Sequence, residues 1–172
     1  PGAQKVHHSY KTGLLYHIYS MVKISESITA FYELDKELLI SGIILHDIGK
    51  IQQIETDLNG YSPGYTIEGY MLGHMIQGVK MLNSLVGELE GIDEEVVMLL
   101  EHMIISHQYD ETWGAYQKPM FLEAEILHHL DMIDSRIEII KEKLNIKPKT
   151  LSDREYFLEN RRIYNPGYKK KE

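Results

Sequence analysis

Hydrophobic residues recur every three to four positions along most of the chain, which is the spacing of amphipathic helices. The first such stretch contains Leu14, Leu15, Ile18, Met21, Val22 and Ile28. Comparable stretches follow Asp35 and Thr66, whose residue types commonly cap the beginning of a helix. The pattern predicts a helix after residue 12, a second from Asp35 to about Gly49, and a third from Thr66 to about Leu85.

The second half of the chain has the same periodicity. Asp93 is followed by two glutamates, and acidic side chains favour the positive end of a helix dipole, so a helix is predicted to begin there. A long periodic stretch runs from about Phe121 to Leu144, and Pro148 breaks the chain after it. The segment Ser152-Asp-Arg-Glu155 has the spacing of a capping box, which predicts a last short helix.

Turn signals separate these helices. Asn59-Gly60 and Ser62-Pro63-Gly64 leave room for a minor hairpin near residues 51–65. Five or six helices joined by short loops predict an all-α helical bundle. We expect a single domain over 1–172, with a core of about 7–164 and a polar tail at 165–172.

Composition narrows the classes of function. The 172 residues include no cysteine, which excludes disulfide scaffolds and cysteine-type zinc sites. No apolar run is long enough to span a membrane and no signal peptide is recognisable, so a cytoplasmic protein without a membrane partner is expected. The net charge of −8 argues against a protein that holds nucleic acid mainly by its overall field, but bound cations could still make a local site positive.

Nine histidines without any cysteine suggest a site for a borderline divalent metal. His46-Asp47 ends a strongly apolar stretch, where burying both groups is costly unless something such as a cation satisfies them. Adjacent residues on a helix point about 100° apart, so other helices must contribute ligands. A lone histidine on a helix is more often a surface group, and the prediction therefore rests on the whole set. The further candidates are His17, His74, His107 and Asp131.

The order of these residues resembles the HD superfamily of metal-dependent phosphohydrolases. Over about residues 7–164 the chain is most similar to the HD domain of YhaM-type 3′–5′ exoribonucleases of Gram-positive bacteria. The motifs that carry the resemblance are Gly13-Leu-Leu-Tyr-His17, Ile44-Leu-His-Asp-Ile-Gly-Lys50, Tyr65-Thr-Ile-Glu-Gly69, Leu72-Gly-His74, Trp113-Gly114, Pro119-Met120, Glu123-Ala-Glu-Ile-Leu-His128 and Leu158-Glu-Asn-Arg161.

By position, the resemblance implies one or two divalent ions and their ligands. The ligands of one ion would be His17, His46, Asp47 and Asp131. Asp47 would bridge to a second ion, which His74 and His107 would also hold. The family implies Mn²⁺ before Fe²⁺, Ni²⁺, Zn²⁺ or Mg²⁺, and a mixed nitrogen and oxygen ligand set is in keeping with that order.

Other residues are candidates for contact with the substrate. The resemblance implies that Lys50 acts with Asp47 in catalysis by binding the substrate phosphate. Trp113 could stack a base, although aromatic residues in loops pack against the protein as often. Asp134 could bind substrate or a ligand, or simply face water, and His128 could orient a ligand from behind.

Two departures from the family qualify this interpretation. The family commonly has a pair of histidines where this chain has His107-Gln108. Family members also carry an N-terminal OB-fold that binds single-stranded nucleic acid, and we expect it to be absent from this chain.

The favoured hypothesis is a metal-dependent phosphodiesterase that cleaves single-stranded RNA or DNA from the 3′ end with metal-activated water. A nucleotidase or cyclic-nucleotide phosphodiesterase acting on small nucleotides is the first alternative. A non-catalytic regulatory module, which could oligomerise, is the second.

Overall fold

The computed structural model describes residues 12–57 and 62–168. Within these ranges the chain forms six α-helices and two 3₁₀ turns, and no β-strand. The helices are α1 (Gly13–Phe31), α2 (Lys36–Leu45), α3 (Lys50–Gln53), α4 (Ile67–Val86), α5 (Glu94–Ser106) and α6 (Leu122–Lys143). The 3₁₀ turns are Glu111–Trp113 and Tyr156–Leu158. The predicted all-α class is therefore confirmed.

Three helices begin where their capping residues predicted. The Asp35 carboxylate accepts a hydrogen bond from the amide of Leu38 at 2.9 Å. The Thr66 hydroxyl accepts a hydrogen bond from the amide of Gly69 at 2.9 Å, and the Asp93 carboxylate accepts one from the amide of Glu95 at 2.8 Å. Each bond satisfies an amide that has no partner within the helix, which is why these residue types mark helix beginnings.

The sequence predicted that the second helix ends at about Gly49, and this end is wrong. Helix α2 stops at Leu45, a tight turn follows, and Gly49 comes directly before α3. A Cβ atom at Gly49 would lie 1.9 Å from the carbonyl oxygen of His74 and 2.6 Å from the amide nitrogen of Gly78. The glycine is therefore needed because the backbone of α4 passes directly against this turn.

The stretch predicted as one helix after Thr66 contains a kink. Gly73 has φ 70° and ψ 168°, which are not helical angles. Residues with a side chain rarely adopt this conformation, whereas glycine does so readily. The kink places His74 at the start of the second part of α4.

The minor hairpin near residues 51–65 reduces to one antiparallel bridge between Ile54 and Tyr65. Helix α3 occupies the beginning of the range, and the Asn59-Gly60 turn signal lies outside the described residues. The predicted short helix after Ser152 is wrong. The Ser152 hydroxyl accepts from the amide of Ile163 at 2.9 Å instead of capping a helix, and antiparallel bridges form around the 3₁₀ turn.

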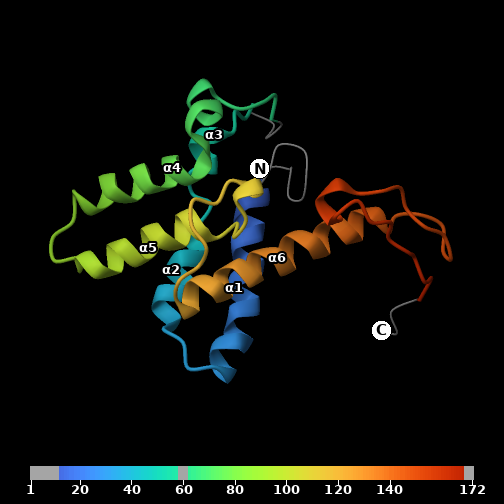
Figure 1. Ribbon diagram of the computed structural model, residues 1–172, viewed down its shortest axis with the longest axis horizontal. Coiled ribbons are helices and arrows are strands. Elements are labelled where there is room, and N and C mark those ends of the chain that lie inside the picture. The colour runs from blue at the N-terminus through green and yellow to red at the C-terminus, as the bar shows by residue number, and fades with distance from the viewer. Residues whose placement is uncertain (1–11, 58–61, 169–172) are drawn as a thin grey trace.

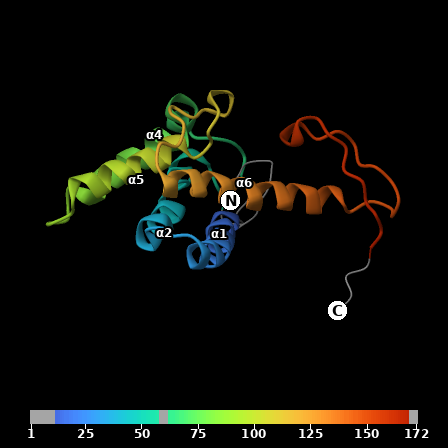
Figure 2. The same cartoon turned by 60° about the horizontal axis from the view of Figure 1, so that its bottom comes forward.

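Helix α2 lies at the centre of the fold, where it packs against α1, α5 and α6. Helices α4 and α5 run side by side, and α6 crosses the bundle and extends beyond it (Figure 1). The segment after α6 lies at its far end, as the second view also shows (Figure 2). The core contains the fully buried side chains Met21, Leu39, Ile43, Met103, Leu127 and Leu130.

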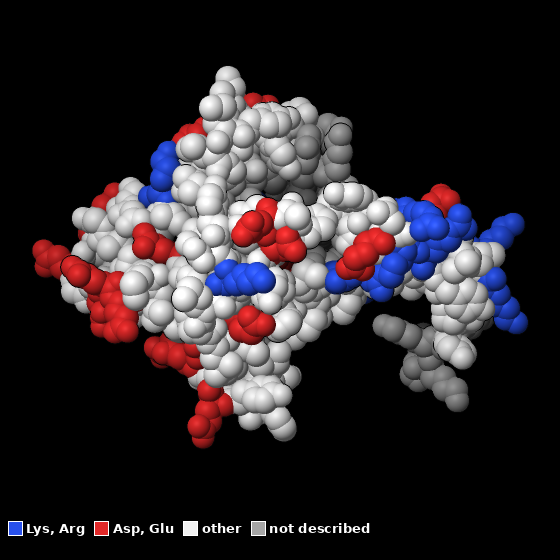
Figure 3. Space-filling view, in the orientation of Figure 1, with Lys and Arg blue, Asp and Glu red and all other residues white. Residues whose placement is uncertain are grey.

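The surface charge is uneven in the view of Figure 3. Acidic side chains gather at the end of the molecule where α4 and α5 meet, and basic side chains gather over the far end of α6 and the segment after it. None of the described helices has the length and apolar character needed to cross a lipid bilayer.

Candidate metal centre

The structure brings the six predicted ligands together at the middle of the bundle. They come from α1, from the turn after α2, from α4, from the end of α5 and from α6. Two groups of ligand atoms form, and within each group the atoms lie within 4.8 Å of one another. The first group is His17, His46 and Asp131, and the second is Asp47, His74 and His107. No more than 2% of His17, His46, Asp47 or His107 is exposed.

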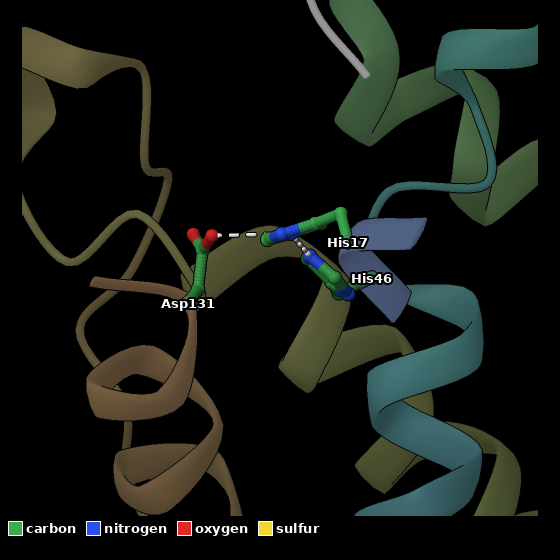
Figure 4. Close-up of side chains that lie close together, drawn as sticks. All are labelled: His17, His46 and Asp131. Atoms are coloured by element: carbon green, nitrogen blue, oxygen red, sulfur yellow. Dashed lines mark hydrogen bonds and ion pairs between the residues drawn. The ribbon is translucent and has the colours of Figure 1, made fainter. Parts of the chain in front are cut away.

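In the first group, His17 Nε2 lies 3.4 Å from His46 Nε2 and 3.3 Å from Asp131 Oδ1 (Figure 4). The picture shows these three side chains converging from three different helical segments. In the second group, His74 Nε2 lies 3.4 Å and His107 Nε2 3.7 Å from Asp47 Oδ1.

Asp47 faces both groups. Its Oδ1 atom is directed to His74 and His107, whereas Oδ2 lies 3.4 Å from His46 Nε2 and 3.9 Å from His17 Nε2. A carboxylate placed in this way can contribute one oxygen to each of two neighbouring sites.

Three of the imidazoles are oriented from outside the centre. His46 Nδ1 donates to the carbonyl of Ile43, and His107 Nδ1 donates to the carbonyl of Ile104, both at 2.8 Å. These carbonyls are available because the histidines follow the last turns of α2 and α5. His17 Nδ1 lies 2.7 Å from an Asp134 oxygen. With a proton held on Nδ1, each of these imidazoles in its neutral form directs the Nε2 lone pair into the centre.

The donor set fits a divalent cation. Asp47 Oδ1 is buried and has no hydrogen-bond partner among the described residues. Leaving such an atom unpaired is costly, and a cation would satisfy it. Metal–ligand bonds of about 2.0–2.2 Å bring neighbouring ligand atoms to roughly 3 Å from one another. The short contacts of 3.3–3.4 Å in both groups come near that spacing.

Burial and nearby charges shift the histidine pKa values in opposite directions, upward for His17 and downward for His74 and His107. Burial alone would lower the pKa of His17, but hydrogen bonds to Asp131 and Asp134 outweigh it and raise the pKa to about 9. Burial lowers the pKa of His74 to about 3 and that of His107 to about 4, with nearby positive charge adding to the effect. The two histidines of the second group are therefore neutral near pH 7, as metal ligands must be.

Lys50 supports the charge of the bridging carboxylate. Its Nζ atom lies 2.6 Å from Asp47 Oδ2. Burial would raise the pKa of Asp47, but Lys50 and the surrounding histidines hold the pKa well below its usual value. Asp47 is therefore ionised throughout the physiological range of pH.

Two cavities border the centre. The larger, of about 580 Å³, reaches His74, and the smaller, of about 220 Å³, reaches His107 and Asp131. The residues that line both cavities are Lys50, Gln108, Trp113 and Phe157. These shared side chains lie where the two cavities adjoin.

The family model for the HD domain matches residues 14–136, and this range includes all six candidate ligands. The chain belongs to the HD domain family. HD domains bind divalent metals, and the cluster around Asp47 could hold one.

Similar proteins support this assignment. The chain is 40% identical to the 3′–5′ exoribonuclease YhaM of Bacillus subtilis (strain 168) over 172 residues, which cover 99% of this chain and 54% of that protein. It is 39% identical over 170 residues to the protein of the same name from Bacillus pumilus (strain SAFR-032), covering 98% and 53%. The chain thus spans about half the length of the curated relatives it matches. No solved structure matches it significantly.

Asp134, for which the sequence left open contact with substrate, contact with a ligand or exposure to water, is buried next to His17. Only 4% of it is exposed, it lines neither cavity, and its carboxylate lies between the Ser20 hydroxyl and His17 Nδ1. Asp134 therefore lies where its carboxylate could orient His17, a candidate ligand. His128 also lies behind the centre, where its Nδ1 donates to the carbonyl of His107 at 2.8 Å.

Trp113 lines both cavities, and 48% of it is exposed. Gln108, in the position where the HD resemblance led us to expect a second histidine, has its side-chain nitrogen 3.5 Å from His74 Nε2. It therefore lies beside the second ligand group and also lines both cavities.

Phe157 was not identified from the sequence. It lies beyond the range that the HD model matches, in the segment after α6, and yet it lines both cavities. The only nearby signal is the motif Leu158-Glu-Asn-Arg161, which begins one residue later. No spacing in the sequence could have placed it beside Trp113.

Proposed function

We propose that this protein is a metal-dependent phosphodiesterase that releases nucleotides from the 3′ end of single-stranded RNA or DNA. The observation that carries the proposal is the position of Asp47, whose two oxygens face two separate groups of imidazole and carboxylate ligands. Such a shared carboxylate is what a pair of neighbouring ions requires, and paired ions are typical of enzymes that hydrolyse phosphate esters.

The proposed ligands are His17, His46, Asp47 and Asp131 for one ion, and Asp47, His74 and His107 for the other. Ions held there would activate water and neutralise charge on the phosphate. Mn²⁺ is the proposed ion, because a mixed set of imidazole and carboxylate ligands suits it better than it suits Mg²⁺ or Ca²⁺.

The chain's own groups prepare this chemistry. The backbone carbonyls behind His46 and His107 fix the Nδ1 protons, so that the opposite nitrogens remain free to bind. Lys50 keeps Asp47 ionised and borders both cavities, where its ammonium group could hold a phosphate oxygen. Trp113 offers a half-exposed ring on which a base could stack.

Two adjoining cavities support a polymeric substrate, since a chain can occupy one cavity while its end occupies the other. The two curated relatives described above are named as 3′–5′ exoribonucleases, which favours RNA. A second candidate function is the hydrolysis of free nucleotides. The limited volume of the smaller cavity, about 220 Å³, favours a small substrate.

The test is incubation of a 5′-labelled single-stranded oligoribonucleotide with the protein and Mn²⁺. We expect products that shorten from the 3′ end, and we expect Asp47→Asn to abolish them because both ligand groups lose their shared carboxylate. Asp93→Asn is the matched control, since asparagine caps a helix as well as aspartate does. Cleavage by Asp47→Asn at the wild-type rate would overturn the proposal.

Mononucleotides and cyclic nucleotides tested in parallel separate the two candidate functions. Hydrolysis of these small substrates alone, with the oligonucleotide left intact, would establish the nucleotidase and reject the exonuclease.

A further inference from the structure

The segment that follows α6 differs in charge from the rest of the molecule. Residues 144–168, here called the C-terminal arm, contain five Lys and Arg residues against three Asp and Glu. Residues 12–143 contain eight against twenty-two. Basic atoms accordingly gather at this end of the molecule (Figure 3). Of these two parts of an acidic protein, the arm is the one that a polyanion can approach with less repulsion.

The carboxylates of the arm leave several of its cations unneutralised. Glu155 pairs with Lys143 at 2.6 Å, and Glu159 pairs with Arg136 and Arg161. Within residues 12–57 and 62–168, no carboxylate lies within 4 Å of the cationic groups of Arg154 or Arg162. Their charges are available to an external ligand.

The arm is a folded element. The side-chain amide of Asn165 donates to the carbonyls of Leu144 at 3.2 Å and Ile146 at 2.9 Å, which fastens the end of the arm to its beginning. Arg154 donates to the carbonyl of Asn160 at 3.0 Å across the 3₁₀ turn. These bonds hold the backbone of the arm together and fix the side chain of Arg154.

The arm also borders the two cavities beside the candidate metal centre. Its Phe157 lines both cavities, and the Phe157 ring lies 5.8 Å from that of Trp113 between centroids. The ring of Tyr156 lies 6.1 Å from Trp113. Phe157, Trp113 and Tyr156 are 39%, 48% and 67% exposed respectively, and the first two line both cavities.

We propose that the C-terminal arm binds the phosphodiester backbone of single-stranded nucleic acid and leads its 3′ end into the cavities. Cationic side chains combined with exposed aromatic rings are the features by which proteins hold single strands without regard to sequence. The inference deepens the proposed function and rests on it. It assigns polymer binding to a segment outside the matched range of the HD domain.

The test compares two doubly substituted proteins that each lose two positive charges. Arg154→Gln with Arg162→Gln changes the arm, whereas Lys23→Gln with Lys36→Gln changes exposed positions on α1 and at the start of α2. Binding of a fluorescein-labelled oligouridylate is measured by anisotropy over a series of salt concentrations, with EDTA present so that the probe stays intact.

We expect the arm variant to bind more weakly and its log affinity to fall less steeply with log salt. Two lost phosphate contacts flatten that slope by about 1.4 for a single strand. The control variant should retain the wild-type slope. Tyr156→Ala should weaken binding roughly 5- to 100-fold without changing the slope, because stacking does not release counterions. Thermal unfolding of each variant verifies that the arm remains folded.

The outcomes separate this inference from the function on which it rests. If the wild type shortens the oligonucleotide and the arm variant binds it like the control, the arm is not the binding surface and the exonuclease stands. If the wild type hydrolyses only mononucleotides and binds no oligonucleotide, the proposed function fails and the inference with it. Arm-dependent binding to phosphatidylserine vesicles, without binding to oligouridylate, would likewise overturn the inference.

Discussion

At the scale of single residues, the centre depends on where each imidazole holds its proton. Backbone carbonyls fix the Nδ1 protons of His46 and His107, whereas His17 uses the carboxylate of Asp134. A charged partner raises the basicity of the ring as well as orienting it. Among the candidate ligands His17, His74 and His107, His17 is therefore the one whose pKa is raised above neutral pH.

This difference predicts how metal affinity depends on pH. Because its pKa is raised to about 9, His17 is protonated in the metal-free protein at pH 7 and must lose that proton to bind an ion. Mn²⁺ affinity should rise about tenfold per pH unit from neutral pH upward and level off near the pKa of His17. Isothermal titration calorimetry in buffers of different ionisation enthalpy measures both the affinity and the released proton.

Asp134→Asn is the variant for this prediction, with Glu138→Gln on the same helix as its control. Removing the charge of Asp134 should lower the pKa of His17, move the rise in affinity to lower pH, and weaken the binding of Mn²⁺ at high pH about 10- to 100-fold. An affinity independent of pH in the wild type, or equal in both variants, would contradict this role for Asp134.

At the scale of elements, the centre depends on close approach between helices. The turn after α2 carries His46 and Asp47, and its Gly49 touches the backbone of α4 next to His74. The kink at Gly73 lies directly before His74, on the part of α4 that makes this contact. Two glycines thus set the distance between the shared carboxylate and the second group of ligands.

Gly49→Ala should therefore disturb both stability and metal binding. Its Cβ would lie 1.9 Å from a backbone oxygen, which no rotation of a side chain can relieve. We expect the free energy of unfolding to fall by about 3 kcal/mol and Mn²⁺ affinity to fall with it, because His74 must move away from Asp47. Denaturant titration and calorimetry measure the two effects.

Gly87→Ala provides the control for that substitution. Gly87 has a helical φ of −63°, and its added Cβ would make only ordinary contacts at 3.5 Å. Its effect should stay within about 0.5 kcal/mol. Equal stability of the Gly49→Ala and Gly87→Ala proteins would mean that the backbone of α4 does not contact the turn after α2 closely.

At the scale of the whole molecule, the candidate ligands come from helices that are far apart in the sequence and meet at the middle of the bundle. They come from α1, α4, α6, the end of α5 and the turn after α2, so ions held by the two groups would together connect every large element. The same region holds a buried carboxylate oxygen with no partner among the described residues. Stability of the fold and occupation of the centre should therefore be linked.

Chelation tests that link. A ligand present at about a thousand times its dissociation constant stabilises the folded state by about 4 kcal/mol, which for a domain of this size raises Tm by roughly 8–16 °C. We expect a shift of this order between protein with millimolar Mn²⁺ and protein with EDTA, measured by differential scanning calorimetry. Asp47→Asn should lose the shift and Asp93→Asn should keep it. An identical Tm in both buffers would argue that the centre holds no ion.

The sequence by itself determined the helical class, the beginnings of helices at Asp35, Thr66 and Asp93, and the set of ligand-type residues. Hydrophobic period and capping are local properties, and the ordered motifs carry the resemblance to HD domains. Only the tertiary structure decided which oxygen of Asp47 faces which histidines, that the Asp134 carboxylate lies beside His17, and that Phe157 lies beside Trp113. These relations join residues far apart in the chain, and their distances depend on how the helices pack, which no local pattern encodes.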